Sequence, residues 1–220
     1  TRLPGRALLP VAGRPLFAHV AFALAAAPRV DRVLVATDAE EVLAAAAEAG
    51  LEAVRTAATH RTGSERCAEV ARAHECEVVI DAQGDWPEVS PADLDALAGS
   101  MLEEGVPLAT LVRPCLDEAV ACDPNVVKVV ADNRDRALYF SRAAIPHARA
   151  KNPVRRLRHV GVYAFRREVL LSLAALPESE LAELEGLEQL RFLAAGVPIR
   201  LVRAGAEAWG IEARPDYEAL

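Results

Sequence analysis

The chain has 220 residues, of which 52% are hydrophobic and only 5% aromatic, which suffices for one large domain or two small ones with a core built mainly from Ala, Val and Leu. A charged fraction of 26% without low-complexity runs argues against disorder, and a net charge of -7 argues against nucleic acid as a partner. The residues present contain no CxxC pair, no apolar run of about 18 residues and no signal-peptide pattern, so we expect a cytoplasmic protein without a zinc–thiolate site or a membrane span.

The first half of the chain alternates short apolar runs with helical patterns. Thr62 and Glu65 have capping-box spacing, and Ser90, Pro91 and Asp93 supply a cap, an N1 proline and a first-turn acid. The predicted strands are 30–36, 51–55, 77–82 and 108–112, and the predicted helices are 38–49, one after Thr62 and one after Ser90. This alternation predicts a parallel sheet wrapped by helices.

The rhythm changes in the second half. The predicted strands are 126–131 and 137–141 around a turn at 132–135, then 159–165 and 199–203. The predicted helices are 167–176, 179–195 and a last one from Asp216. Two strands so close together inside an α/β chain indicate either a mixed sheet or an inserted subdomain.

Two acids follow predicted strands. Asp38 and Asp85 each stand at a carboxyl end, which is where ligands bind in open α/β sheets. Two carboxylates near one crevice suit Mg²⁺, which takes oxygen ligands and can bridge phosphate oxygens. The alternative for Asp38 is that it only caps the following helix. Asp85 has no helix start nearby, which favours a functional role.

A short loop at the start of the chain carries two guanidinium groups. Arg2 and Arg6 flank a Pro-Gly turn. Such a loop can bind phosphates through paired hydrogen bonds, although solvated arginine pairs are also common on loops.

Several motifs, in order and spacing, resemble one family: TRLPGR, VLVATD, HRTGSERCAEV, QGDWP, DPNVVKVV, ALYFSRAAIP, RHVGVYAF and LEGLEQLRFL. The chain is similar over nearly its whole length to 3-deoxy-manno-octulosonate cytidylyltransferase, the CMP-Kdo synthetase. The segments LYFSRAAIP and LEQLR are the most specific to this family.

The resemblance implies a Rossmann-like, mixed but mostly parallel α/β sheet of the nucleotide-sugar transferase type. It implies a single domain over 1–220, in which 113–165 contributes a smaller sugar-binding and dimerisation subdomain. The implied reaction joins CTP and Kdo into CMP-Kdo and pyrophosphate, with Mg²⁺, for lipopolysaccharide synthesis in a homodimer. Family members have a strand before the segment that matches TRLPG, so we expect the native N-terminus to extend beyond Thr1.

The resemblance also assigns metal ligands. Asp85 of QGD would bind Mg²⁺, and Glu212 stands where the family has a second aspartate. Glu is one methylene longer, which bears on rate or metal choice because octahedral geometry is strict. Trp86 replaces a common acid, and it is either a packed aromatic over the loop or a change in substrate or metal handling.

For the sugar acid, the family pattern places Arg142 on the carboxylate, beside His159 and Tyr163. It adds Glu188 and Gln189 as hydroxyl partners and Gln83 beside the anomeric centre. Independently, a guanidinium just past an apolar strand suits a carboxylate, and residues four apart on a strand share a face. The residues alone leave open a core histidine at 159 and a solvated helix face at 188–189.

For the nucleotide, the resemblance implies that Arg2 and Arg6 contact the triphosphate, and that Asp85 also belongs to the nucleotide site. The expected catalytic residues are Asp85, Arg6 and Glu212. The segment 60–66 would face cytosine, with Ser64 and Arg66 as binding residues and Ser64 at a helix N-terminus. Lys128 could reach phosphate or a partner subunit, and the sequence does not decide between them.

Two other functions remain open from the sequence. One is the same reaction on another acid sugar, such as an amino-Kdo or a sialic acid. The other is a non-catalytic nucleotide-binding relative, because Glu212 and Trp86 both depart from the family pattern near the metal.

Overall fold

The computed structural model describes residues 5–86, 89–149 and 155–205. The elements are η1 (Arg6–Leu8), β1 (Pro10–Val11), β2 (Arg14–Pro15), α1 (Leu16–Ala25), β3 (Val35–Thr37), α2 (Glu40–Glu48), β4 (Ala53–Arg55), α3 (Gly63–Ala73), β5 (Val78–Ala82), α4 (Pro91–Ser100), β6 (Leu108–Cys115), α5 (Glu118–Cys122), β7 (Lys128–Ala131), β8 (Ala137–Ser141), β9 (Arg156–Arg166), α6 (Arg167–Leu171), η2 (Ser172–Ala175), α7 (Glu180–Glu185), α8 (Gln189–Ala194) and β10 (Ile199–Arg203). Across the described ranges, every helix falls short of the length and apolar character that a membrane span needs.

The main sheet is mixed, and the prediction of a mostly parallel sheet is wrong. Its order is β10-β6-β9-β7-β8, and β5 also pairs with β9. In this sheet β10 and β6 are parallel, whereas β9 is antiparallel to β5, β6 and β7, and β7 is antiparallel to β8.

The cause is the position of β9. Because β5 and β6 are both antiparallel to β9, they run in the same direction as each other, as the strand–helix alternation predicts. Strand β9, which comes later in the chain, lies between β5 and β6. Each of these two strands therefore has an antiparallel neighbour instead of pairing in parallel with the other. The two parallel strands β3 and β4 form a separate pair among the described residues.

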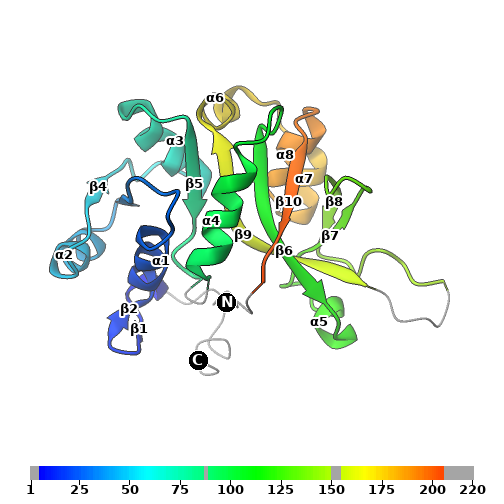
Figure 1. The fold of residues 1–220 in the computed structure, drawn as a ribbon, viewed down its shortest axis with the longest axis horizontal. Helices are drawn as coiled ribbons and strands as arrows, with labels where there is room; N and C mark the ends of the chain where they lie inside the picture. Colours follow the sequence, from blue (N-terminus) through cyan, green and yellow to red (C-terminus); the bar gives the residue numbers. More distant parts are fainter. Residues whose placement is uncertain (1–4, 87–88, 150–154, 206–220) are drawn as a thin grey trace.

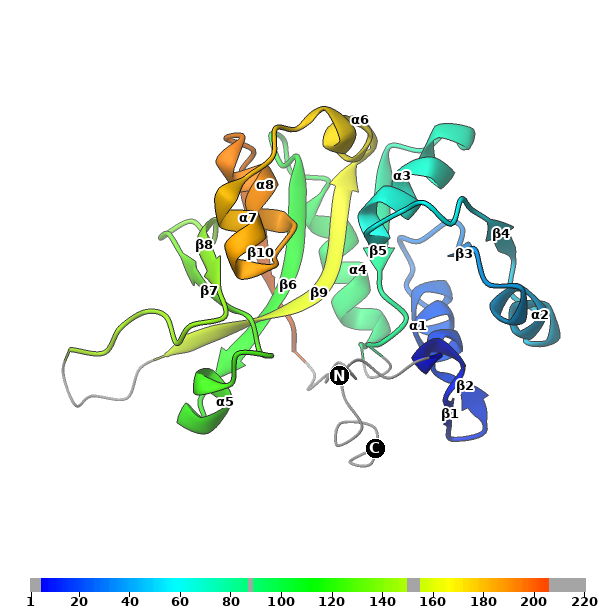
Figure 2. The ribbon, with the colours of Figure 1, turned by 180° about the vertical axis from the view of Figure 1, so that it is seen from behind.

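Helices cover both faces of the main sheet (Figures 1 and 2). On one face, Leu94 and Leu97 of α4 pack with Val160 and Val162 of β9. On the other face, α3, α6 and α8 pack against Phe165 and its neighbours. Burial on both faces explains why the strand sequences read as continuous apolar runs.

Local sequence signals set several helix boundaries. Thr62 accepts a hydrogen bond from the Glu65 N–H at the start of α3, and Ser90 accepts one from the Asp93 N–H at the start of α4, as predicted. The predicted helix over 179–195 is instead divided into α7 and α8, because Gly186 adopts a left-handed conformation at φ 61° and ends α7. The predicted helix from Asp216 lies outside the described residues.

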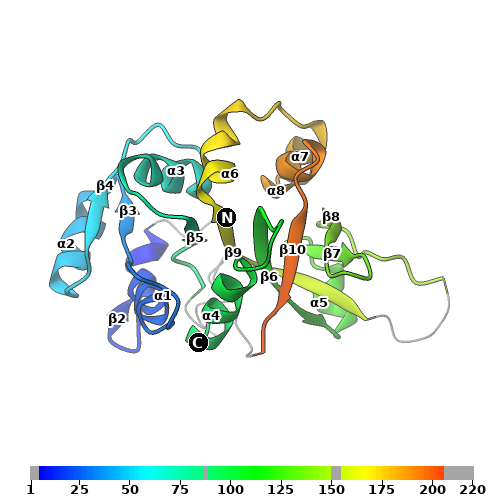
Figure 3. The ribbon, with the colours of Figure 1, turned by 45° about the horizontal axis from the view of Figure 1, so that its top comes forward.

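The two ends of the molecule consist of different helices and strands (Figure 3). The β3–β4 pair with α2 lies at one end, and the β7–β8 hairpin with α5 lies at the other. Between them, the carboxyl end of β5 and the face of β9 that carries Tyr163 line the same pocket.

Candidate active site

A single large pocket collects the predicted site residues. It has a volume of about 1290 Å³ and is lined by parts of β3, α3, β5, β9, the loop 123–127 and the start of α8. The predicted residues that line it are Arg6, Ser64, Arg66, Gln83, Asp85, Arg142, His159, Tyr163, Glu188 and Gln189. Arg2 and Glu212 lie outside the described residues, so their predicted roles stay predictions.

The loop after β5 brings Asp85 to the pocket. Asp85 is buried, and its Oδ2 lies 2.6 Å from Nη2 of Arg6. Gly84 lets the loop approach α1, because a Cβ at this position would lie 3.0 Å from Cβ of Phe17. A glycine therefore precedes the acid because the loop passes close to α1 just before Asp85, where a side chain would collide with Phe17.

Trp86 packs against the central strand. A Cβ added at Gly161 of β9 would lie 2.9 Å from Nε1 of Trp86, so the indole lies directly over the glycine backbone. Trp86 also contacts the core on the α4 face of the sheet. Trp86 therefore packs against β9 and the core, and it also lines the pocket, so its effect on substrate or metal handling stays a prediction.

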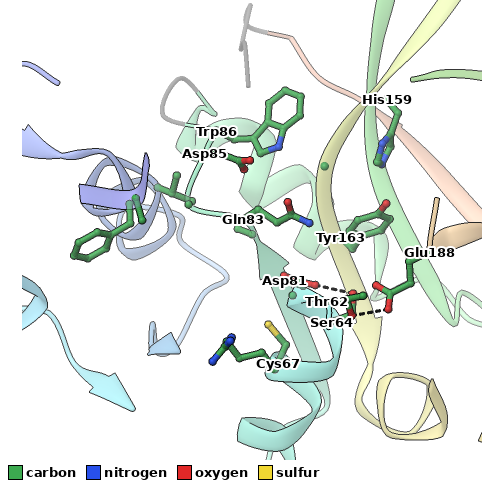
Figure 4. Close-up of a pocket in the computed structure, with 18 of the residues that line it drawn as sticks. Thr62, Ser64, Cys67, Asp81, Gln83, Asp85, Trp86, His159, Tyr163 and Glu188 are labelled. Atoms are coloured by element: carbon green, nitrogen blue, oxygen red, sulfur yellow. Dashed lines mark hydrogen bonds between the residues drawn. The ribbon is translucent and has the colours of Figure 1, made fainter. Parts of the chain in front are cut away.

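An aromatic row lines the opposite wall (Figure 4). His159 and Tyr163 share a face of β9, as predicted, with ring centroids 5.2 Å apart, and Phe140 lies 5.3 Å from the His159 ring. Burial lowers the pKa of His159 to about 3 and raises the pKa of Tyr163 well above its usual value. Both side chains are therefore neutral near pH 7.

The hydrogen-bond pattern assigns the His159 tautomer. Oγ1 of Thr110 donates to the Val162 carbonyl at 2.8 Å and lies 2.9 Å from Nε2 of His159. A hydroxyl has a single hydrogen, so Nε2 carries the ring hydrogen and donates it to Thr110. This leaves Nδ1 of His159 as a hydrogen-bond acceptor.

The N-terminus of α3 carries a polar cluster. Ser64 Oγ donates to Oδ2 of Asp81 at 2.9 Å, and Thr62 Oγ1 donates to Oε1 of Glu188 at 2.7 Å. Burial raises the pKa of Asp81 to about 6, against the hydrogen bonds from Ser64 and Cys67 that lower it. The Ser64 hydroxyl hydrogen is thus used by Asp81, and the Glu65 N–H is used by Oγ1 of Thr62.

Arg142 is held rigidly at the far end of the pocket. Its Nε donates to the Glu185 carbonyl at 2.7 Å, and its Nη1 donates to the Pro124 carbonyl at 2.9 Å. Its backbone N–H donates to the Glu185 carboxylate at 2.8 Å. Burial alone would raise the pKa of Glu185, but the hydrogen bonds from Arg142 and Ser141 outweigh it and lower that pKa.

Gln189 presents an unused donor. The residue is 5% exposed and lines the pocket, and its Nε2 has no hydrogen-bond acceptor among the described residues. A buried amide without a partner is costly, so a ligand oxygen at this place would stabilise the side chain.

Asp38 does not behave as either alternative predicts. The N-cap of α2 is Ala39, and no side chain caps that helix. Oδ1 of Asp38 instead pairs with Nη2 of Arg66 at 2.8 Å, and Asp38 is absent from the pocket lining. Arg66, which also donates to Thr56, is therefore oriented by Asp38 at the edge of the pocket.

Asp85 is a pocket carboxylate that suits Mg²⁺. No group of three or more His, Cys, Asp or Glu side chains in these ranges could hold a metal ion by itself. Mg²⁺ commonly uses one or two protein carboxylates together with substrate phosphates and water, and Asp85 fits such a role.

Two further site residues, Asp81 and Glu185, were not predicted from the sequence. Asp81 sits within a predicted strand, where an acid among Val78, Val79 and Ile80 is itself a signal of function, because an unpaired buried carboxylate is costly. Glu185 lies in an acidic helix that gives no such signal, since only the fold brings it to Arg142.

Comparison with known proteins identifies the family. The cytidylyltransferase family model matches residues 1–200. A 3-deoxy-manno-octulosonate cytidylyltransferase from Myxococcus xanthus (strain DK1622) is 42% identical over 100% of this chain and 90% of its own length. The enzyme of that name from Escherichia coli is 39% identical over 96% of this chain and 86% of its own.

Solved structures agree. A CMP:2-keto-3-deoxy-manno-octonic acid synthetase complexed with CTP superposes with a TM-score of 0.94 at 39% identity, covering 100% of this chain and 91% of that one. A nucleotidyl transferase from Methanothermobacter thermautotroptrophicus, at 21% identity and a TM-score of 0.62 over 97% of this chain and 82% of that one, shares the fold. The chain belongs to the 3-deoxy-manno-octulosonate cytidylyltransferase family.

Proposed function

We propose that this protein transfers CMP from CTP to the anomeric hydroxyl of 3-deoxy-manno-octulosonate, as the names of its relatives state for those proteins. The hydroxyl oxygen forms a bond to the α-phosphorus, the bond from that phosphorus to the bridging oxygen breaks, and pyrophosphate leaves. The observation that carries the proposal is that the residues expected for nucleotide and for sugar acid line one pocket.

The nucleotide would occupy the end of the pocket formed by Arg6, Asp85 and the start of α3. Arg6 supplies a guanidinium for phosphate oxygens, while Ser64 and Arg66 lie on α3. The N-terminal N–H groups of this 11-residue helix favour electron-rich ligand atoms. The relative solved in complex with CTP supports CTP as the nucleotide.

The sugar acid would lie between β9 and the start of α8. Arg142 supplies a cation for the carboxylate, and Gln189 supplies a buried donor that lacks an acceptor in the described residues. Nδ1 of His159 and the Glu188 carboxylate can accept hydrogen bonds from sugar hydroxyls. Gln83 points toward Tyr163 (Figure 4), and the anomeric centre would lie beside its amide.

We propose that Mg²⁺ is the cofactor, held by Asp85 and by Glu212, which lies outside the described residues. When bound, it would neutralise phosphate charge and polarise the reacting oxygens. The rest of the catalysis falls to side chains that hold the two substrates in line, since phosphoryl transfer depends mainly on positioning and charge.

We also propose that the protein is one domain that forms a homodimer through 113–165. Two leucines in this segment support the proposal, because Leu116 is 80% exposed and Leu138 is 62% exposed. Sedimentation of the wild type and of a Leu116→Glu, Leu138→Glu variant tests it. A dimer that the two substitutions convert to monomer supports it, and an unchanged assembly contradicts it.

The proposed reaction is tested by pyrophosphate release. The purified protein is incubated with CTP, Mg²⁺ and one sugar acid from a panel that includes Kdo, an amino-Kdo and a sialic acid. We expect the highest kcat/KM with Kdo. If only another acid sugar is turned over, the reaction type is supported but Kdo is rejected as the substrate. Tight CTP binding without pyrophosphate release would indicate a non-catalytic relative.

A further inference from the structure

Lys128 is fully buried and ends in a cage of backbone oxygens. Its Nζ donates to the carbonyls of Asp123 at 2.8 Å, Val126 at 2.5 Å and Arg142 at 2.6 Å. A lysine ammonium has three hydrogens, so these three carbonyls use its whole donor capacity. Lys128 therefore contacts neither the pocket nor the molecular surface.

The cage joins two walls of the pocket. The loop 123–127 and Arg142 both line the pocket, while Lys128 lies behind them. Pro124, whose carbonyl accepts a hydrogen bond from Nη1 of Arg142, lies between the two loop residues that Lys128 binds. The ammonium thus fixes Arg142 at its own backbone and at the loop that holds its guanidinium.

A neutral side chain could not do this. Three carbonyl oxygens that converge on one point repel each other, and a cation at that point makes their approach favourable. Burial lowers the pKa of Lys128, which shows that the charged form is held at a cost.

We propose that Lys128 is a positioning residue for Arg142, and that it sets the guanidinium in place for the carboxylate of the sugar acid. This inference rests on the proposed function only for the identity of the ligand. Lys128 acts through Arg142 and the loop 123–127, and it touches neither substrate nor metal.

Steady-state kinetics of Lys128→Met tests the proposal. Met fills similar space without the charge, so we expect the KM for the sugar acid to rise roughly tenfold or more while the KM for CTP changes less than about twofold. In an Arg142→Ala background, Lys128→Met should add little to the KM for the sugar acid, because the group that it positions is gone. Equal rises in both KM values, or additive effects of the two substitutions, would overturn the proposal.

A matched control separates positioning from general instability. Met101 is fully buried in the core beside α4 and does not line the pocket, so Met101→Ala should lower the melting temperature without changing the ratio of the two KM values. If Met101→Ala changes that ratio as much as Lys128→Met does, the selective role of Lys128 is rejected.

Hydrogen exchange gives a readout that needs no activity. In Lys128→Met, amide exchange should accelerate in 123–127 and at 141–142, and Met101→Ala should leave these segments protected. Unchanged exchange there would overturn the proposal even in an active enzyme. Conversely, a wild type without turnover would reject the proposed reaction, while local acceleration would still support the role of Lys128 toward Arg142.

Discussion

Nη2 of Arg6 lies 2.6 Å from Oδ2 of Asp85, and this ion pair joins the loop at the start of the chain to the loop after β5. The Asp85 side chain is 7% exposed and that of Arg6 is 26% exposed, so the acid is buried and the guanidinium reaches toward the pocket. We expect a metal-bound triphosphate to exchange these partners, with the metal taking Asp85 and phosphate oxygens taking Arg6.

The substitution Asp85→Asn should reduce kcat by at least about a hundredfold, the scale of removing one electrostatic group from a transition state. The side chain keeps its size, so the loss reflects charge. Pyrophosphate release measures it. The control is Asp38→Asn, which removes the partner of Arg66 at the pocket edge and should have a much smaller effect. Turnover of Asp85→Asn at the wild-type level would remove the metal assignment.

The substitution Gln189→Leu should weaken sugar acid binding without harming the fold. It removes a buried amide that lacks an acceptor in the described residues, so the unfolding free energy should stay equal or rise. The KM for the sugar acid should increase by about fivefold or more, the loss of roughly 1 kcal/mol from one hydrogen bond. Kinetics and urea denaturation of the same preparation provide both numbers. Reduced stability with an unchanged KM would contradict the assignment.

The substitution Gly161→Ala should destabilise the protein through Trp86. The new Cβ would lie 2.9 Å from Nε1 of the indole, which forces Trp86 or the strand to move at a cost of about 1–3 kcal/mol. In a Trp86→Ala background the same substitution should cost much less, since the obstruction is gone. Denaturation of the four proteins in this cycle measures the coupling, and independent effects would show that the indole lies elsewhere.

Stability should depend on the protonation of Asp81. Its pKa is raised from 3.8 to about 6, so its contribution to stability is present below pH 3.8 and is lost as the pH rises through about 6. Asp81→Asn removes this loss and keeps an acceptor for Ser64. The variant should therefore exceed the wild type by about 3 kcal/mol at pH 8, and the two should converge near pH 4.

The protonation of His159 changes stability with pH in the opposite direction. Its pKa is lowered from 6.5 to about 3, so its contribution is present above pH 6.5 and is lost as the pH falls through about 3. The two slopes oppose each other in the wild type between about pH 4 and 6, and Asp81→Asn should reveal the slope of His159. Thermal unfolding at pH 4.5, 6 and 8 measures both. A difference between variant and wild type that does not change with pH would contradict the assignment of Asp81.

Local features could be predicted from the sequence because they depend on neighbours in the chain. The bounds of β8 and β10 match the predicted strands, and the caps Thr62 and Ser90 follow from side chains that reach their own helix. The break at Gly186 was missed, since a helical apolar pattern continues across it and outweighed a single glycine.

The features that could not be predicted depend on contacts between distant segments. The alternation of strands and helices sets the directions of β5 and β6, but it cannot reveal that β9 lies between them. Likewise, Glu185 and Lys128 fix Arg142 from segments on either side of it, and their sequence neighbourhoods show no sign of this. The pocket residues themselves were predicted through the family resemblance rather than from periodicity.

The central claim is that one pocket aligns a nucleoside triphosphate at Arg6 and Asp85 with a sugar acid at Arg142. A crystal structure of the wild type with Mg²⁺, Kdo and a CTP analogue that cannot release pyrophosphate tests it most directly. The account predicts triphosphate oxygens beside Arg6, the sugar carboxylate on Arg142 and the anomeric oxygen near Gln83. A triphosphate bound away from Arg6, or a sugar acid that does not contact Arg142 and Gln189, would contradict it.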